Sequence, residues 1–402
     1  MKNLIILLSL VLVSCNAKPN KEKQTEKASM IAVKEDVKII VAANQTAEYL
    51  DLLKGKKVGI VANQTSVIFK GDTNVHLVDS LVSLDVEITK VFAPEHGFRG
   101  KADAGEHVED GIDAKTGLPI ISLYGANRKP SHEHLKDLDV ILFDIQDVGV
   151  RFYTYISTLH NVMEVCAELN IPLIVLDRPN PNGHYIDGPM LQEEAKSFVG
   201  MHPVPTVYGM TIGEYGKMIN GEKWLENGIQ CNLTVIPLKN YTHNSEYDLP
   251  ILPSPNLPNA KSINLYPSLC FFEGTNVSAG RGTEMQFQIF GSPFLAKESF
   301  DFSFTPQPNF GAKHPKHEGE VCFGKDLRTH KKLSSLNLEW LIESYAKTAD
   351  KEKFFNKFFL KLAGTKDLQK QIEAGLSFEE IQLSWQNDLT FFKEVRKMYV
   401  LY

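Results

Sequence analysis

The fold is indicated most clearly by one stretch of sequence, VFAPEHGFRG at residues 91–100. An apolar, strand-like segment covers residues 86–93 and stops at a proline, and Glu95, His96 and Arg99 follow within a few positions. In open α/β sheets, ligands bind just outside the carboxyl ends of the strands. A carboxylate, an imidazole and a guanidinium at such an end can exchange protons and hold an anion. The stretch therefore predicts a strand end that carries part of a functional site.

The same arrangement recurs along the chain, which disfavours the simpler interpretation of a polar turn with a helix start. Apolar runs at residues 139–143 and 171–176 also end in acidic, amide and arginine side chains. Further strand candidates cover residues 58–62 and 118–123, and a helix is expected over residues 157–169. Short buried strands that alternate with helices are typical of a parallel, doubly wound sheet. In such a sheet the polar strand ends all lie at one edge.

Composition and motifs limit the possible ligands and partners. No Gly-x-Gly-x-x-Gly follows a strand candidate, and no Walker-type loop is present, so we expect neither a dinucleotide nor a nucleoside triphosphate bound in the usual way, and no cofactor. The net charge of −6 and the lack of a basic block argue against a nucleic-acid partner. Four widely spaced cysteines fit no zinc motif and are expected to be buried and free: Cys166, Cys231, Cys270 and Cys322.

The N-terminus has the features of an export signal. After a short cationic start, residues 4–13 form an apolar core of about the length of a secretory signal and shorter than the roughly 20 residues that span a bilayer. The core closes with Leu-Val-Ser-Cys, which resembles the bacterial lipoprotein cleavage box and implies lipidation of Cys15. We therefore expect a signal peptide at residues 1–15, a flexible tether at residues 16–36, and a location in the bacterial envelope, anchored by lipid and facing the periplasm.

The second half of the chain has a different pattern. Thr211 and Glu214 have the spacing of a capping box, which makes Glu214 a structural residue. Residues 272–284 combine three glycines, two acids and an arginine, which is typical of a loop at a site, although a long hairpin connection has a similar composition. Residues 336–402 are mainly helical by pattern, with Ser377 as an N-cap.

Ten segments of this chain together resemble one known family. They lie at residues 62–66, 93–100, 144–155, 177–183, 197–200, 208–211, 253–258, 273–283, 384–385 and 399–402. The family is that of the exo-β-N-acetylmuramidases of peptidoglycan turnover, the NamZ type, which was long known only as a domain of unknown function. The resemblance runs from about Val58 to the last residue, and one visible departure is His184, where a second glycine is expected.

The resemblance implies both a fold and an activity. The implied fold is α/β, with a Rossmann-like parallel sheet domain followed by a smaller α/β domain that ends in a helical tail. We place the first domain at residues 37–200 and the second at residues 201–402, with the active site in the cleft between them. The implied activity is release of N-acetylmuramic acid (MurNAc) from the non-reducing end of peptidoglycan-derived glycan fragments, which would be the partners of this enzyme.

Glycoside hydrolysis normally needs two groups, an acid that protonates the leaving oxygen and a second carboxylate. We predict Glu95 as the general acid because it stands at a strand end. The candidates for the second group are Glu273, Asp144 and Asp147, and a third possibility is attack by the substrate's own acetamido group, oriented by an acid. His96 is either a further acid/base group or a residue that holds Glu95 in place.

The substrate has features that predict its binding residues. MurNAc carries a lactyl carboxylate, and bidentate pairing favours arginine over lysine as its partner. A sugar face can stack on a tyrosine ring. The residues expected to bind substrate are Arg99, Asp147, Arg151, Tyr153, Tyr155, Asp177, Arg178, Asn180, Asn276 and Arg281.

Two other classes of protein remain open at this point. In a metal-dependent hydrolase, His96, Asp144, Asp147 and Asp177 would bind a cation, although no zinc-type spacing supports this and we predict no metal site. In a lipoprotein that binds muramyl glycans without catalysis, the same sheet and cleft would serve retention alone, because a fold does not determine a function.

Overall fold

The computed structural model describes residues 38–100, 110–125 and 127–402. The expected signal peptide, the tether and Cys15 lie outside these described residues. Lys38–Tyr402 form one compact unit. Within the described ranges, no helix combines the length and the apolar character needed to cross a membrane.

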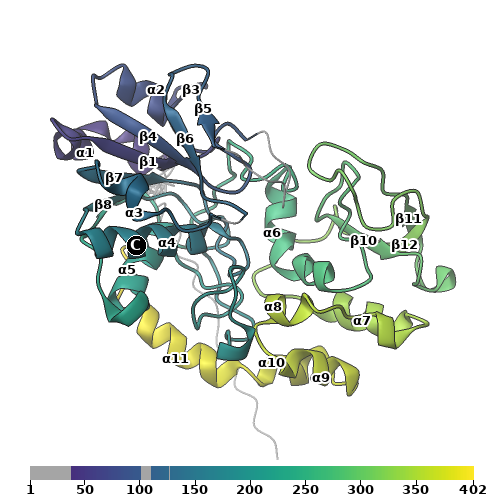
Figure 1. The fold of residues 1–402 in the computed structure, drawn as a ribbon. Coiled ribbons are helices and arrows are strands. Elements are labelled where there is room, and N and C mark those ends of the chain that lie inside the picture. The colour runs from purple at the N-terminus through teal and green to yellow at the C-terminus, as the bar shows by residue number, and fades with distance from the viewer. Residues whose placement is uncertain (1–37, 101–109, 126) are drawn as a thin grey trace, which may run out of the picture. The chain divides into compact units, whose positions relative to one another are not determined.

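The main sheet has seven strands in the order β5-β6-β4-β1-β7-β8-β9 (Figure 1). Their bounds are β5 Gly111–Ile112, β6 Pro119–Ser122, β4 Ile88–Ala93, β1 Val58–Ala62, β7 Val140–Asp144, β8 Leu173–Leu176 and β9 Leu233–Ile236. Neighbouring strands pair in parallel, except that β5 is antiparallel to β6. The prediction of a doubly wound α/β sheet is therefore confirmed.

Both faces of this sheet are covered, which explains why its strands are apolar throughout. Val61 and Phe143 pack on one face in a core shared with α4 (Tyr155–Leu169) and α5 (Ile212–Gly221). The alternate residues, such as Ile60 and Leu142, pack on the other face with α1 (Thr46–Leu53) and α2 (Leu77–Val82). Smaller elements near the sheet are η1 (Ala42–Asn44), the hairpin of β2 (Val67–Lys70) and β3 (Thr73–His76), α3 (His132–Leu135), η2 (Glu193–Ala195) and η3 (Glu226–Gly228).

The second half builds a smaller lobe around a three-stranded antiparallel sheet, in the order β10-β12-β11. Its elements are α6 (Ala260–Leu269), η4 (Cys270–Gly274), β10 (Ile289–Ser292), η5 (Lys297–Ser299), β11 (Phe302–Phe304) and β12 (Cys322–Asp326). In Figure 1, α6 lies between the two sheets. This lobe confirms the expected smaller α/β part of the fold.

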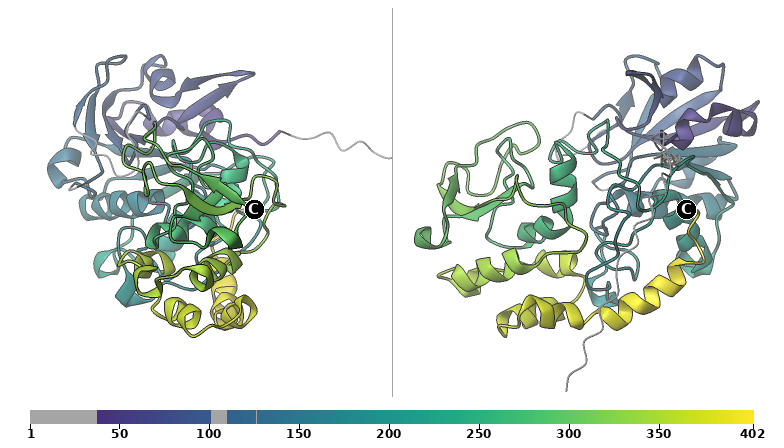
Figure 2. Two further views of the ribbon diagram at one scale, coloured as in Figure 1. Left: turned by 90° about the vertical axis from the view of Figure 1, so that its right-hand side faces the viewer. Right: turned by 180° about the vertical axis from the view of Figure 1, so that it is seen from behind.

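The helical tail is also confirmed. Its elements are α7 (Glu339–Lys347), η6 (Lys351–Lys353), α8 (Phe359–Ala363), α9 (Asp367–Glu373), α10 (Phe378–Leu383) and α11 (Gln386–Arg396). Figure 2 shows these helices, in yellow, passing along the smaller lobe and then beside the helices of the main sheet. The last residues return to the sheet, where the Tyr402 hydroxyl donates a hydrogen bond of 2.7 Å to the Asp177 carboxylate.

The expected domain boundary at residue 200 differs from this arrangement. β9 pairs with β8 as the edge strand of the main sheet, so residues well beyond 200 still belong to that sheet. The half-exposed alternation of β9, with burial on one side only, made it resemble part of a separate domain. The capping boxes that begin at Thr211 and Ser377 are confirmed, and the four cysteines after Cys15 are buried and free.

Candidate active site

Glu95 stands on the turn that follows β4, and two hydroxyl groups hold its carboxylate. The Tyr124 hydroxyl donates to Oε1 at 2.9 Å, and Thr154 Oγ1 donates to Oε2 at 2.8 Å. Thr154 is the N-cap residue of α4, yet its side chain makes no capping hydrogen bond to that helix. An N-cap hydroxyl usually satisfies a free backbone N–H of its helix. Here that stabilising contact is replaced by a contact to the carboxylate.

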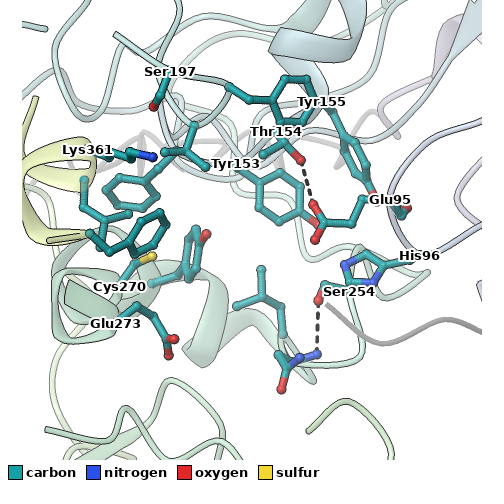
Figure 3. Close-up of a pocket in the computed structure, with 18 of the residues that line it drawn as sticks. Glu95, His96, Tyr153, Thr154, Tyr155, Ser197, Ser254, Cys270, Glu273 and Lys361 are labelled. Carbon is teal, nitrogen blue, oxygen red and sulfur yellow. Dashed lines mark hydrogen bonds between the residues drawn. The ribbon is translucent and has the colours of Figure 1, made fainter. Parts of the chain in front are cut away.

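Glu95 lines a cavity of about 390 Å³, a volume in the range of small-molecule sites (Figure 3). Eight regions of the chain form its walls, from the turn after β4 to α8. The lining residues are Glu95, His96, Tyr124, Arg128, Phe152, Tyr153, Thr154, Tyr155, Ser197, Phe198, Val199, Ser254, Asn256, Leu257, Tyr266, Cys270, Glu273, Arg281, Phe287, Phe358, Lys361 and Leu362.

His96 is buried beside Glu95, in a left-handed backbone conformation with φ of 71°. Histidine is one of the few residues besides glycine that adopts this conformation with some frequency. The turn directs the imidazole to the wall of the cavity next to the carboxylate. The placement fits both roles that the sequence left open.

Tyr153 and Tyr155 form an aromatic wall with Tyr266, in edge-to-face contacts with ring centroids 5.0 and 5.9 Å apart. The hydroxyls of Tyr153 and Tyr155 donate to the carbonyl oxygen of Pro253, at 2.8 and 3.4 Å. These bonds fasten the proline-rich loop to the aromatic wall that lines the cavity.

Glu273 enters the same cavity from the smaller lobe, and Figure 3 shows it on the side opposite to Glu95. Its Oε2 lies 3.7 Å from Nη1 of Arg281, which also lines the cavity. The half-buried Lys316 ammonium donates to the carbonyl oxygens of Phe272, Thr275 and Val277, and so holds the loop that carries Glu273. The loop at residues 272–284 is therefore part of the site.

Asp144 and Arg178 do not line this cavity, although both follow strand ends. They form an ion pair buried in the sheet, with Arg178 Nε and Nη2 at 2.6 and 2.8 Å from the two carboxylate oxygens. Their side chains are 0% and 2% exposed, so neither can contact a ligand without breaking the pair. The pair has a structural role in place of the catalytic and binding roles expected for Asp144 and Arg178.

Asp147, Asp177 and Asn180 are likewise buried away from the cavity. Asp147 accepts hydrogen bonds from the Tyr208 hydroxyl and from the backbone N–H of Gly149. Asp177 accepts from Thr211, Gly213 and Tyr402, and Asn180 donates to the carbonyl of Met210. Segments from residue 202 onward cover these strand ends, so the three side chains fasten loops to the sheet.

The other expected binding residues have structural contacts of their own. Arg99 pairs with Asp79 and Asp113 at 3.0 and 2.7 Å. Arg151 is fully buried and donates to the carbonyl oxygens of Pro189, Val204, Leu362 and Ala363. Asn276 does not line the cavity, and its backbone carbonyl accepts a bond of 2.7 Å from His317. Of the arginines expected to bind substrate, only Arg281 lines the cavity.

The residues of the metal alternative are not brought together. Asp144, Asp147 and Asp177 each have their own buried partners, and His96 lies at the cavity. Among the described residues, the one group of three with ligand spacing is Glu164, Glu168 and Glu226, from α4 and η3. Lys129 already bonds Glu164 and Glu168 at 2.6 and 2.7 Å.

The buried carboxyls of Asp147 and Asp177 predict a pH dependence of stability. Burial raises the pKa of each from 3.8 to about 6 in the native state. Between pH 4 and 6 the native chain therefore binds more protons than the unfolded chain, and this contribution to stability is lost as pH rises. For Asp177 the change is on the order of 3 kcal/mol.

We expect the stability difference between wild type and Asp177→Asn to depend on pH in this window. In urea titrations, wild type should lose stability relative to Asp177→Asn between pH 4 and 6, while the exposed Asp388→Asn should follow wild type at every pH. A constant difference between wild type and Asp177→Asn would show that Asp177 titrates as in the unfolded chain.

The lining residues that the sequence did not predict include Tyr124, Arg128, Thr154 and Lys361. Tyr124 directly follows the strand candidate at residues 118–123. The rule that ligands bind at the carboxyl ends of parallel strands, here called the strand-end rule, therefore indicates Tyr124 as a site residue. Thr154 lies inside a family-like segment but resembles an ordinary N-cap. Arg128 and Lys361 lie in polar stretches with no pattern that marks them.

Two carboxylates from different parts of a chain that face one cavity are the arrangement used by glycoside hydrolases. Comparison with protein families agrees with this class. The family model described as exo-β-N-acetylmuramidase NamZ, N-terminal, matches residues 58–261, and the corresponding C-terminal model matches residues 264–402. The chain therefore belongs to the exo-β-N-acetylmuramidase NamZ family.

Individual relatives cover nearly the whole chain. The peptidoglycan β-N-acetylmuramidase NamZ of Bacillus subtilis strain 168 is 37% identical, over 97% of this chain and 96% of that protein. The crystal structure of one DUF1343 family protein of Bacteroides fragilis NCTC 9343 matches with a TM-score of 0.83 at 45% identity, covering 91% of this chain and 99% of that one. A second DUF1343 structure from the same strain gives 0.76 at 29% identity, covering 90% and 99%.

Proposed function

We propose that this protein is an exo-acting β-N-acetylmuramidase, a glycoside hydrolase that releases MurNAc from the non-reducing end of peptidoglycan-derived glycans. The observation that carries the proposal is a single cavity with Glu95 and Glu273 on opposite sides and with tyrosine rings along its wall. Membership of the NamZ family over nearly the whole chain supports the same activity and substrate. Release of MurNAc from glycan fragments fits a role in turnover and recycling of the cell wall.

We assign the role of general acid to Glu95. Its two hydroxyl partners, Tyr124 and Thr154, can each donate or accept a hydrogen bond, so they suit both the protonated and the ionised carboxyl. A general acid passes through both states in each turnover. His96, buried next to it, would keep the carboxyl oriented and the local water excluded.

Glu273 is the second group of our proposal, since Asp144 and Asp147 do not reach the cavity. Its carboxyl group lies 3.7 Å from Arg281 Nη1 in the cavity wall, where it can act as a nucleophile, as a base or as a group that orients the substrate acetamide. Proton NMR of the first-formed anomer would separate these roles. Retention of the β-configuration indicates a nucleophile or acetamide participation, and inversion indicates a base acting on water.

The test of the proposed function is hydrolysis of para-nitrophenyl β-MurNAc, with the β-N-acetylglucosaminide (GlcNAc) as the control substrate. We expect release from the muramide and little from the glucosaminide. Retention of muramyl glycans without turnover would instead support a binding protein. Activity that is lost with a chelator and restored by a divalent ion would support the metal-dependent alternative.

We also propose that the enzyme is lipid-anchored through Cys15 and acts at the periplasmic face of the envelope. The proposal rests on the apolar core at residues 4–13 and on the cleavage-box pattern that ends at Cys15. The prediction is that Cys15→Ser moves the protein from the detergent-extracted membrane fraction to the soluble fraction, with unchanged activity. If Cys15→Ser and wild type fractionate alike, the anchor is elsewhere or absent.

A further inference from the structure

Two cations that line the cavity have no acidic partner among the residues that the structure describes. Arg128 and Lys361 are both exposed, and among the described residues no carboxylate forms an ion pair with either side chain. Arg281 is the third arginine or lysine that lines the cavity, and its Nη1 lies 3.7 Å from the carboxylate of Glu273. The cavity therefore has an excess of positive charge at Arg128 and Lys361.

Both cations lie near the turn at residues 197–200. The Arg128 guanidinium lies 4.4 Å from the ring centroid of Phe198, and the Phe198 carbonyl accepts a bond of 2.7 Å from Ser157 in α4. The stacked guanidinium keeps its N–H groups at the ring edges available for an anion.

Lys361 is brought to the same region by Arg151. That buried guanidinium donates to the carbonyl oxygens of Leu362 and Ala363, the two residues after Lys361. Arg151 also lies against Gly200, where a β-carbon would be 3.7 Å from its Cδ. It thus joins α8 to the turn at residues 197–200, and Figure 3 shows Lys361 on the Ser197 side of the cavity.

We propose that Arg128 and Lys361 form a subsite for a carboxylate of the substrate, and that this subsite selects muramic over glucosamine residues. The inference rests on the proposed function. MurNAc and GlcNAc differ by the lactyl ether, whose carboxylate is the only charge on the sugar. Beside two cations that no carboxylate among the described residues neutralises, such an anion forms charge-assisted hydrogen bonds. A stem peptide on the lactyl group offers the same chemistry at its own terminal carboxylate.

The experiment compares wild type, Arg128→Met, Lys361→Met and the double variant. Lys357→Met is the matched control, because Lys357 precedes α8 by two residues and does not line the cavity. The substrates are para-nitrophenyl β-glycosides of MurNAc, of its uncharged lactamide, and of MurNAc-L-alanine. A charged hydrogen bond is worth about 10- to 100-fold in binding. We therefore expect each single variant to lose about that factor in kcat/KM on the substrate whose carboxylate occupies the subsite, either MurNAc or MurNAc-L-alanine.

The pattern over the substrates decides the proposal and identifies the carboxylate. Losses on MurNAc, with the lactamide rate equal in variants and wild type, assign the lactyl carboxylate. Losses on MurNAc-L-alanine alone assign the peptide carboxylate. Equal rates for all variants on both charged substrates, or equal losses on the lactamide, overturn the subsite while wild-type activity still supports the proposed function. No hydrolysis by folded wild type would instead overturn the proposed function.

Discussion

Glu95→Gln is expected to lower kcat/KM for MurNAc release by about 10²- to 10⁴-fold, the usual contribution of a positioned acid or base. The amide has the size of the carboxyl and can still exchange hydrogen bonds with Tyr124 and Thr154, so the fold of the turn is retained. It cannot supply a proton to the leaving oxygen. Stopped or continuous assays on purified protein, with circular dichroism to confirm folding, measure the effect.

The leaving group separates a general acid from other roles. A sugar hydroxyl needs protonation on departure far more than para-nitrophenolate does. The loss in Glu95→Gln should therefore be larger for the disaccharide MurNAc-GlcNAc than for the para-nitrophenyl glycoside, and Glu298→Gln, an exposed carboxyl outside the cavity, should lose nothing. Equal losses on both substrates would contradict the acid role and indicate that Glu95 acts on the sugar itself.

Arg178→Met is expected to lower the free energy of unfolding by about 3–5 kcal/mol, the usual cost of breaking a buried ion pair. The substitution leaves the Asp144 carboxylate with no countercharge at a site that is 0% exposed. It also removes the hydrogen bond from Nη2 to the carbonyl of Val67. Urea denaturation followed by fluorescence measures the change.

The controls test whether the charge is responsible. Removing both charges in Asp144→Leu/Arg178→Met should recover part of the loss, because no isolated charge is then buried. Lys239→Met removes one partner of the half-exposed pair with Glu48 and should leave the unfolding midpoint unchanged. A double variant less stable than Arg178→Met would contradict this account of the pair.

Much of the fold was predictable because its signals are local. The strands at residues 58–62 and 139–143 are short apolar runs that the sheet buries on both faces, and the capping boxes at Thr211 and Ser377 are set by residues three positions apart. The edge strand β9 was assigned to the wrong part of the chain, because its half-buried alternation says nothing about its neighbour in the sheet.

The site was predictable only in part. The strand-end rule located the edge of the sheet, and Glu95 and His96 do line the cavity there. The rule does not say which strand ends are covered by later segments, and Tyr208, Thr211 and Tyr402 come from far along the chain to bury Asp147 and Asp177. The arginines that follow strand ends were predicted to bind an anion. Instead, the guanidiniums of Arg99 and Arg178 pair with acidic side chains, and that of Arg151 donates to backbone carbonyls.

Identification of the products from one defined glycan tests the central claim most directly. The substrate is a tetrasaccharide of alternating MurNAc and GlcNAc with MurNAc at its non-reducing end, and products are followed in time by mass spectrometry. The account predicts free MurNAc together with a trisaccharide that begins with GlcNAc, and no further shortening of that trisaccharide. Disaccharide products from internal cleavage, or no cleavage by folded protein, would contradict it.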